Sequence, residues 1–312
     1  MNTIAIIGAG MAGLSCATRL AAAGHTVTVF DKGRGPGGRM ATRRAEVAGE
    51  TLLFDHGAQY LTARDDRFAR QVAEWETSGV VARWPAAGQG AFVGVPGMNA
   101  PIKAMASGLD VHFGNRVEAF GQSGAGWRLD GEGLPEHLFD TILVAVPAEQ
   151  AGPLLSAHSP DMARIADRTV AGPCWTVMAA FESALDHGDT IQDAGAIGWA
   201  ARNSAKPGRG HEECWVVQAS PDWSREYLEE EADAVIPLLL EELRARVGGK
   251  LPVIRHVAAH RWRYARSGAA GQSAVWDREV RVGACGDWLI GPRIEDAFIS
   301  GLELADKVLA DG

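Results

Sequence analysis

Cysteine is scarce in this sequence, and long apolar runs do not occur. The four cysteines are scattered, without a CxxC spacing or a nearby pair of histidines, so the sequence predicts neither a disulfide framework nor a metal site. The first apolar run, residues 4–7, ends at Gly8 and is too short for a signal peptide. No later run reaches the roughly 18 apolar residues of a membrane span. These absences predict a cytoplasmic protein that does not meet a membrane.

Positive charge is also limited. The chain has 30 Lys and Arg residues against 39 Asp and Glu residues, for a formal net charge of −9. A nucleic-acid surface needs Lys and Arg concentrated on one face, so nucleic acid is excluded as an expected partner. With 312 residues and 46% hydrophobic content, the chain is large enough for two domains or for one domain with an insert.

A glycine-rich turn is the first feature that is present. An apolar strand over residues 4–7 leads into the spacing G-x-G-x-x-G, and a helical pattern follows until Gly24. A turn without side chains leaves room for a pyrophosphate, and the start of the helix supplies free amides. Asp31 ends the next strand, where its carboxylate can accept the ribose hydroxyls of an adenosine. The dinucleotide contacts expected from this unit are Gly8, Gly10, Met11, Ala12, Gly13, Asp31 and Lys32.

A second pair of glycines lies between arginines in the stretch RGPGGRMATRR. Its form, R-x-x-G-G-R-x-x-T, resembles the second fingerprint of FAD enzymes of the glutathione reductase and amine oxidase type. Bare backbone allows the main chain to approach the middle of FAD, and the guanidinium of Arg39 offers a planar fork to phosphate oxygens. The motif residues are Arg34, Gly37, Gly38, Arg39 and Thr42, and the expected contacts are Gly38, Arg39 and Met40.

A third element is expected near the end of the chain. Residues 280–284 predict a strand, Gly286 and Asp287 a turn, and the following stretch a closing helix. Asp287 resembles the flavoprotein aspartate that binds a ribityl hydroxyl. The amides at the start of the helix, at Glu295, Asp296 and Ala297, would face the flavin edge on which reduction places negative charge. The apolar stripe of this helix is predicted at Phe298, Leu302, Ala305 and Leu309.

The middle of the chain is predicted to be richer in strands. Residues 174–182, 196–201, 214–220 and 252–262 are strand candidates, and most are not separated by helical crossovers of adequate length. They therefore predict a mostly antiparallel sheet. Asp65 is expected to begin a helix that ends at Gly79. Ser224 is expected to cap a second helix, which Pro237 should kink or split. Residues 202–210 are expected to form a mobile loop.

The fold class expected is α/β, with a discontinuous Rossmann-like FAD-binding domain and an α+β substrate domain on a mostly antiparallel sheet. Residues 140–151 resemble the stretch where such proteins return to the nucleotide-binding sheet. The expected FAD-binding domain comprises residues 1–60, 100–153 and 273–312, and the expected substrate domain comprises residues 61–99 and 154–272.

Three segments are expected to line a pocket at the flavin ring: residues 53–65, 94–100 and 259–267. The last of them interleaves aromatic residues with Arg261, Arg263 and Arg266, which offers flat faces to a ring and forks to anions.

Four stretches of the chain, DHGAQYLTARD, WAARNSAKP, AHRWRYA and ACGDW, resemble the bacterial renalases. The resemblance implies an FAD-dependent oxidase that takes a hydride from 2- or 6-dihydro isomers of NAD(P) onto flavin N5, giving NAD(P)⁺ and, with oxygen, hydrogen peroxide. Aromaticity drives this transfer, so alignment matters more than acid or base chemistry, and no catalytic side chain is expected. The expected substrate contacts are His56, Gln59, Tyr60, Arg64, Pro96, Gly97, Met98 and Trp262, and the FAD contacts of this segment are His56, Gly57 and Ala58.

Other flavin-dependent functions remain open from the sequence. An amine oxidase shares all three FAD elements, but such enzymes commonly use a lysine near flavin N5, and some attach FAD to a cysteine. Here Lys206 lies in a Gly/Pro loop, and Cys285 is better explained by the strand that it ends, so FAD is expected to be non-covalent. A desaturase or other dehydrogenase, and a non-catalytic flavin-bound redox sensor, are the remaining alternatives.

Overall fold

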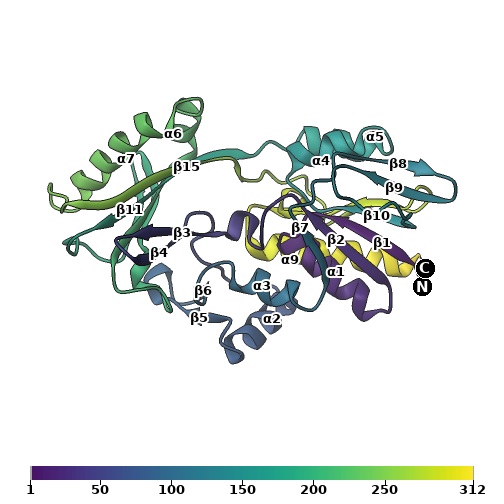
Figure 1. Ribbon diagram of the computed structural model, residues 1–312, viewed down its shortest axis with the longest axis horizontal. Helices are drawn as coiled ribbons and strands as arrows, with labels where there is room; N and C mark the ends of the chain where they lie inside the picture. Colours follow the sequence, from purple (N-terminus) through teal and green to yellow (C-terminus); the bar gives the residue numbers. More distant parts are fainter. Residues whose placement is uncertain (1, 312) are drawn as a thin grey trace.

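The computed structural model describes residues 2–311, and its largest sheet lies at the end of the molecule that carries both chain termini (Figure 1). The strands, in spatial order, are β16 (Val275–Asp277), β17 (Val282–Ala284), β10 (Thr141–Val144), β1 (Thr3–Ile7), β2 (Thr26–Asp31) and β7 (Asp110–Phe113). All neighbouring pairs from β17 to β7 are parallel, whereas β16 is antiparallel to β17. Parallel strands are buried on both faces, and β1 (TIAII) and β10 (TILV) are accordingly almost entirely apolar.

Two helices from opposite ends of the chain, α1 (Met11–Ala22) and α9 (Ile294–Ala310), cover one face of this sheet. The Ser15 hydroxyl donates to the carbonyl of Phe298 at 2.8 Å. A Cβ atom on Gly301 would lie only 2.1 Å from the carbonyl oxygen of Ala12, so glycine is required where the helices meet. The helix of the glycine-rich turn is therefore fixed by the last helix of the chain.

Further short elements complete the core around this sheet. On the α1 side they are α2 (Asp66–Thr77), β5 (Val81–Arg83), β6 (Phe92–Gly94) and α3 (Ala100–Ala106). The opposite face is covered by β8 (Ala119–Ser123), β9 (Gly126–Asp130), α4 (Ala148–Leu155), α5 (Pro160–Asp167) and α8 (Asp287–Ile290). Asp65 begins α2 as predicted, because its carboxylate accepts the amide of Arg67 at 2.8 Å.

A second, five-stranded sheet is antiparallel throughout, as the sequence predicts, and the expected fold class is confirmed. Its strands, in spatial order, are β12 (Thr190–Ala194), β13 (Ile197–Arg202), β14 (Glu213–Ala219), β11 (Gly172–Phe181) and β15 (Ile254–Arg266). Helix α7 (Ala232–Arg246) packs on one face, and the hairpin of β3 (Thr42–Val47) and β4 (Glu50–Asp55) packs on the other (Figure 1).

Three local predictions are wrong. The segment expected to be one helix is two, α6 (Pro221–Glu226) and α7, and the first is capped by Ser220 rather than Ser224; α7 continues through Pro237. Residues 202–210 are not a mobile loop, because Asn203, Lys206 and Arg209 are buried. The stripe of α9 is also displaced, since Leu302 and Leu309 are only half-buried. Among residues 2–311, no helix combines the length and apolarity needed to cross a membrane.

Candidate active site

The glycine-rich turn between β1 and α1 has two tightly packed glycines and one open one. A Cβ atom on Gly8 would lie 2.4 Å from the carbonyl oxygen of Ala145, and one on Gly13 would lie 1.9 Å from that of Gly8. A Cβ atom on Gly10 would meet nothing within 4 Å among the described residues. Gly8 therefore allows the turn to approach the end of β10, and Gly13 allows α1 to pack against the end of β1. Gly10 instead leaves space at the start of the helix, where a pyrophosphate is expected.

Asp31 lies at the carboxyl end of β2, as expected for a ribose-binding acid. Its carboxylate accepts the amides of Ala9 at 2.8 Å and Gly33 at 2.7 Å, which fixes its orientation beside the turn. Each carboxylate oxygen can accept a further hydrogen bond, so the group can still take a hydroxyl. The side chain of Lys32 is directed elsewhere, since its Nζ donates to Gln150 in α4 at 2.8 Å.

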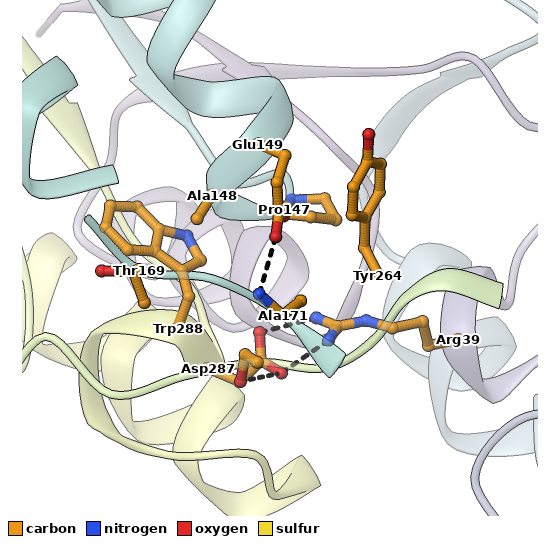
Figure 2. Close-up of a pocket in the computed structure, with 10 residues that line it drawn as sticks. Arg39, Pro147, Ala148, Glu149, Thr169, Ala171, Tyr264, Asp287 and Trp288 are labelled. Atoms are coloured by element: carbon orange, nitrogen blue, oxygen red, sulfur yellow. Dashed lines mark hydrogen bonds and ion pairs between the residues drawn. The ribbon is translucent and has the colours of Figure 1, made fainter. Parts of the chain in front are cut away.

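Arg39 and Asp287, both expected to contact FAD, form a bidentate ion pair with distances of 2.6 and 2.7 Å. Figure 2 shows this pair among the residues that line a narrow pocket. The Ser267 hydroxyl donates to the same carboxylate at 2.9 Å. The ion pair thus joins the second glycine motif to the end of β17. The other lining residues are Pro147, Ala148, Glu149, Thr169, Ala171, Tyr264 and Trp288.

The turn after β4 brings Gly57 and Ala58 against the second glycine motif. The amide of Ala58 donates to the carbonyl of Arg39 at 2.8 Å, and a Cβ atom on Gly57 would lie 2.0 Å from the same oxygen. Gln218, from β14, donates to the carbonyl of Gly57 at 2.7 Å, and Trp262, from β15, donates to the carbonyl of His56 at 2.8 Å. Two strands of the five-stranded sheet, β14 and β15, therefore contribute residues that hold this turn in place.

An uncharged aromatic cluster lies beside the turn. The rings of His56, His260 and Trp262 are in mutual contact, with centroids 4.4 to 5.1 Å apart. Burial, the neighbouring His260 and Arg43 lower the pKa of His56 to about 4, and burial and Arg43 lower the pKa of His260. Both imidazoles are therefore neutral at neutral pH. The ring of Tyr60 contacts that of Trp199, with centroids 5.2 Å apart.

The buried His56 should make the fold less stable as the pH falls from 6.5 to about 4. Across this window the unfolded chain binds a proton that the folded chain excludes, so the free energy of unfolding decreases, by about 3 kcal/mol in total. We expect His56→Asn to remove this part of the pH dependence in urea denaturation. The exposed His137 provides the control, His137→Asn, and full retention of the pH dependence in His56→Asn would contradict the assignment.

Three residues predicted to contact substrate lie in the turn before α3. Met98 is fully buried in the core, and its amide donates to Asp55 at 2.9 Å; Gly97 packs on Thr42, and Pro96 is exposed. Arg64, which is also predicted to contact substrate, is exposed.

The start of α9 offers fewer free amides than expected. The buried carboxylate of Glu295 accepts the amides of Arg64 and Asp65 at 2.5 and 2.6 Å, so it fixes the start of α2. At the start of α9, the amide of Ala297 already donates to the carbonyl of Arg293. Asp296, beside it, has its pKa raised by burial. Gly286, which precedes α8 and was also expected to contact FAD, donates its amide to the hydroxyl of Ser300 at 2.9 Å.

Two of the arginines that were expected to bind anions contact protein groups instead. Arg263 forms a bidentate pair with Glu229, with distances of 2.7 and 2.8 Å. Arg261 donates to the carbonyl of Leu228 at 2.7 Å and lies over the ring of Trp175. These two arginines therefore bind the segment between α6 and α7 rather than the pocket.

A buried cluster of charged side chains was not predicted from the sequence. The fully buried Asp55 contacts Arg209, and it lies 3.2 Å from the Nζ of Lys206. Burial alone would raise the pKa of Asp55, but the two cations lower it to about 2. Asp55 itself could have indicated the cluster, because it ends the buried strand β4 and a buried carboxylate needs a cation.

Comparisons with known proteins agree with this geometry. Residues 6–75 match the NAD(P)-binding Rossmann-like domain, and residues 76–309 match the flavin containing amine oxidoreductase family. The chain therefore belongs to the flavin-containing amine oxidoreductase family. It is an FAD-dependent oxidoreductase, which confirms the enzyme class predicted from the sequence.

Solved structures share the fold over almost the whole chain. A protein from Exiguobacterium sp. 255-15, provisionally named protoporphyrinogen oxidase, has a TM-score of 0.75 and 12% identity, with coverage of 100% of this chain and 99% of that one. A triple mutant of putrescine oxidase has a TM-score of 0.72 and 14% identity, with coverage of 100% and 99%. Cyclohexylamine oxidase from Brevibacterium oxydans IH-35A has a TM-score of 0.69 and 12% identity, with 99% coverage of both chains.

Two curated relatives match a short segment of the chain. The 4,4'-diapophytoene desaturase of Staphylococcus haemolyticus is 58% identical over 62 residues, which are 20% of this chain and 12% of the desaturase. The lysine-specific histone demethylase 1 homolog 3 of Oryza sativa subsp. japonica is 39% identical over 61 residues, which are 20% of this chain and 8% of the demethylase. These relatives therefore do not define a substrate.

Proposed function

We propose that this enzyme oxidises dihydronicotinamide dinucleotides, namely the 2- or 6-dihydro isomers of NAD(P), as the renalases do. The observation that carries the proposal is the neutral aromatic cluster packed against Gly57. The ring of Trp262 lies 3.4 Å from the position of a Cβ atom on Gly57. The uncharged indole face of Trp262 suits a planar dihydronicotinamide, whose oxidation needs alignment rather than a proton acceptor.

FAD fits the residues on the other side of the turn. Gly10 leaves space at the start of α1, Asp31 can accept ribose hydroxyls, and Arg39 and Asp287 bring a guanidinium and a carboxylate to the middle of the site. We propose that FAD is held without a covalent bond, because all four cysteines are buried. When bound, FAD would accept the hydride and pass the electron pair to oxygen, giving hydrogen peroxide.

The chain's own residues would then orient the substrate and exclude water. Trp262 is held in place by its bond to the carbonyl of His56, and the neutral His56 and His260 add apolar ring surface beside it. The contacting rings of Tyr60 and Trp199 form a second aromatic surface. The exposed guanidinium of Arg64 could contact substrate phosphates.

Amine oxidation is the second candidate, and the family match over residues 76–309 favours it. The lysine used near flavin N5 by many amine oxidases has no free counterpart at Lys206, because that side chain is fully buried and bonded to Asp55 and Gln59. A flavin-bound redox sensor that turns over no substrate is the third candidate function.

Mixing the FAD-loaded protein with each substrate class without oxygen distinguishes these functions. We expect rapid loss of flavin absorbance with the 2- or 6-dihydro isomers of NAD or NADP, and none with putrescine or cyclohexylamine. Bleaching only by an amine would establish amine oxidation instead, and bleaching by no compound would favour the sensor.

A matched pair of variants tests the aromatic cluster in the same assay. Trp262→Phe removes the bond to the His56 carbonyl and should slow bleaching roughly tenfold, because the ring loses its fixed alignment. Trp276→Phe, in β16, removes a comparable indole bond to Asp311 and should bleach at the wild-type rate.

A further inference from the structure

Lys206 is an unusual lysine, because its whole side chain is buried. Its Nζ lies 3.2 Å from Asp55 Oδ2 and 3.0 Å from Gln59 Oε1, and 5.3 Å from the centre of the Trp84 ring. The segment that carries it, residues 202–210, is held by further bonds, including those from Asn203 to the carbonyl of Leu53 and from Arg209 to Asp55. The position of the ammonium group is therefore fixed from several sides.

A short chain of hydrogen bonds links Lys206 to the turn at Gly57. Gln59 Nε2 donates to the carbonyl of Gly57 at 3.0 Å and to that of Asp55 at 2.5 Å. An ammonium group can only donate, so Lys206 requires Gln59 to present its oxygen to the lysine and its amide protons to the two carbonyls. In this way Lys206 determines which way the Gln59 amide points.

Lys206 is not needed to neutralise Asp55. Arg209 already contacts the same carboxylate oxygen, so the second cation leaves the cluster of Asp55, Lys206 and Arg209 with an excess positive charge. Burial lowers the pKa of Lys206 to about 8, which shows that the protein environment disfavours this ammonium. A buried charge of this kind is weak evidence for stability, so its bond to Gln59 is the better explanation of its presence.

We propose that Lys206 is a positioning residue, which through Gln59 holds Gly57 and Ala58 against Arg39 and so sets the turn beside the flavin. The proposal rests on the proposed placement of flavin at this turn, but not on which substrate is oxidised. Lys206 itself touches neither flavin nor substrate. Its effect is on the alignment of the turn and of the aromatic cluster bonded to it.

The test compares Lys206→Met with Lys103→Met, which changes an exposed lysine on α3. In the protein without FAD, we expect amide hydrogen exchange in residues 56–59 to be faster in Lys206→Met, while the thermal midpoint does not fall, since a buried charge is removed. With FAD bound, we expect an altered flavin absorbance spectrum and a roughly tenfold lower kcat with KM almost unchanged. Lys103→Met should match the wild type throughout.

A second variant keeps the test decisive if Lys206→Met does not fold. Gln59→Leu breaks the same link but leaves the pair of Asp55 and Arg209 in place, and it should give the same exchange and spectral changes. The double variant should be no worse than the more affected single one, because both act through one link. Wild-type exchange and spectrum in Lys206→Met or Gln59→Leu, or additive losses in the double variant, would overturn the proposal. The exchange and spectral measurements need no substrate, so they remain valid if the proposed substrate is wrong.

Discussion

Replacing Asp55 with Asn should lower the free energy of unfolding by about 3 to 5 kcal/mol, because it leaves the cations of Lys206 and Arg209 buried without a carboxylate. The same carboxylate also accepts the hydroxyl of Thr42 at 2.7 Å and the amide of Met98 at 2.9 Å. One residue therefore connects the β3–β4 hairpin, the turn before α3 and the segment between β13 and β14. The measurement is urea denaturation of the protein without FAD at neutral pH.

Lowering the pH should reduce the free energy of unfolding by different amounts in the wild type and in the Asp55→Asn variant. The pKa of Asp55 is lowered from 3.8 to about 2, so its contribution to stability is complete above pH 3.8 and is lost as the pH falls toward 2. Asp55→Asn should lack this component. The control is Asp222→Asn, at an ion pair on α6 in which both side chains are mostly exposed, and it should leave stability almost unchanged. An Asp55→Asn protein as stable as this control would contradict the role of the cluster.

Two glycines of the first motif should differ in their effect on stability when each is changed to Ala. In Gly13→Ala the new methyl group would lie 1.9 Å from the carbonyl of Gly8, so α1 must move away from β1 and both stability and FAD binding should be lost. In Gly10→Ala the methyl group meets no described atom within 4 Å, so the apoprotein should remain as stable as the wild type. FAD affinity should nevertheless fall by tenfold or more, or about 1.4 kcal/mol, because the methyl group occupies the space expected for the pyrophosphate.

Urea denaturation and a fluorescence titration with FAD measure the two effects separately. If Gly10→Ala binds FAD like the wild type, the pyrophosphate does not lie at this turn. If Gly13→Ala retains wild-type stability, the close packing of β1 and α1 is not required.

Local patterns were enough to predict the fold class. The spacing of the first motif, the strand-forming residues of β11 and β14 and the cap at Asp65 each depend on neighbours in sequence, and the elements that they predict are present in the structure. Ser220 and Ser224 show the limit of such reasoning, because both can cap a helix. Pro221 at the first helical position favours Ser220, and Ser224 instead accepts the amide of Trp175 in β11.

The supporting residues of the site could not be predicted, because they depend on partners that are distant in sequence. Lys206 and its partner Asp55 are separated by 151 positions, and a Gly/Pro-rich context around the lysine is typical of an exposed loop. Glu295 likewise bonds amides more than 200 positions away, a use that the dipole at the start of α9 does not indicate. Sequence reasoning identified the motifs that are expected to face a ligand, but not the ion pairs that hold them.

The placement of α9 and β17 has a consequence for biosynthesis. Because translation proceeds from the amino terminus, β1, β2 and α1 leave the ribosome long before α9, which packs on α1, and β17, which pairs with β10 in the finished sheet. Until α9 emerges, the apolar side of α1 that it covers remains exposed, and Asp287 cannot yet meet Arg39. Loading with the coenzyme should therefore be a late, post-translational event, and nascent chains should depend on chaperones to shield that surface in the meantime.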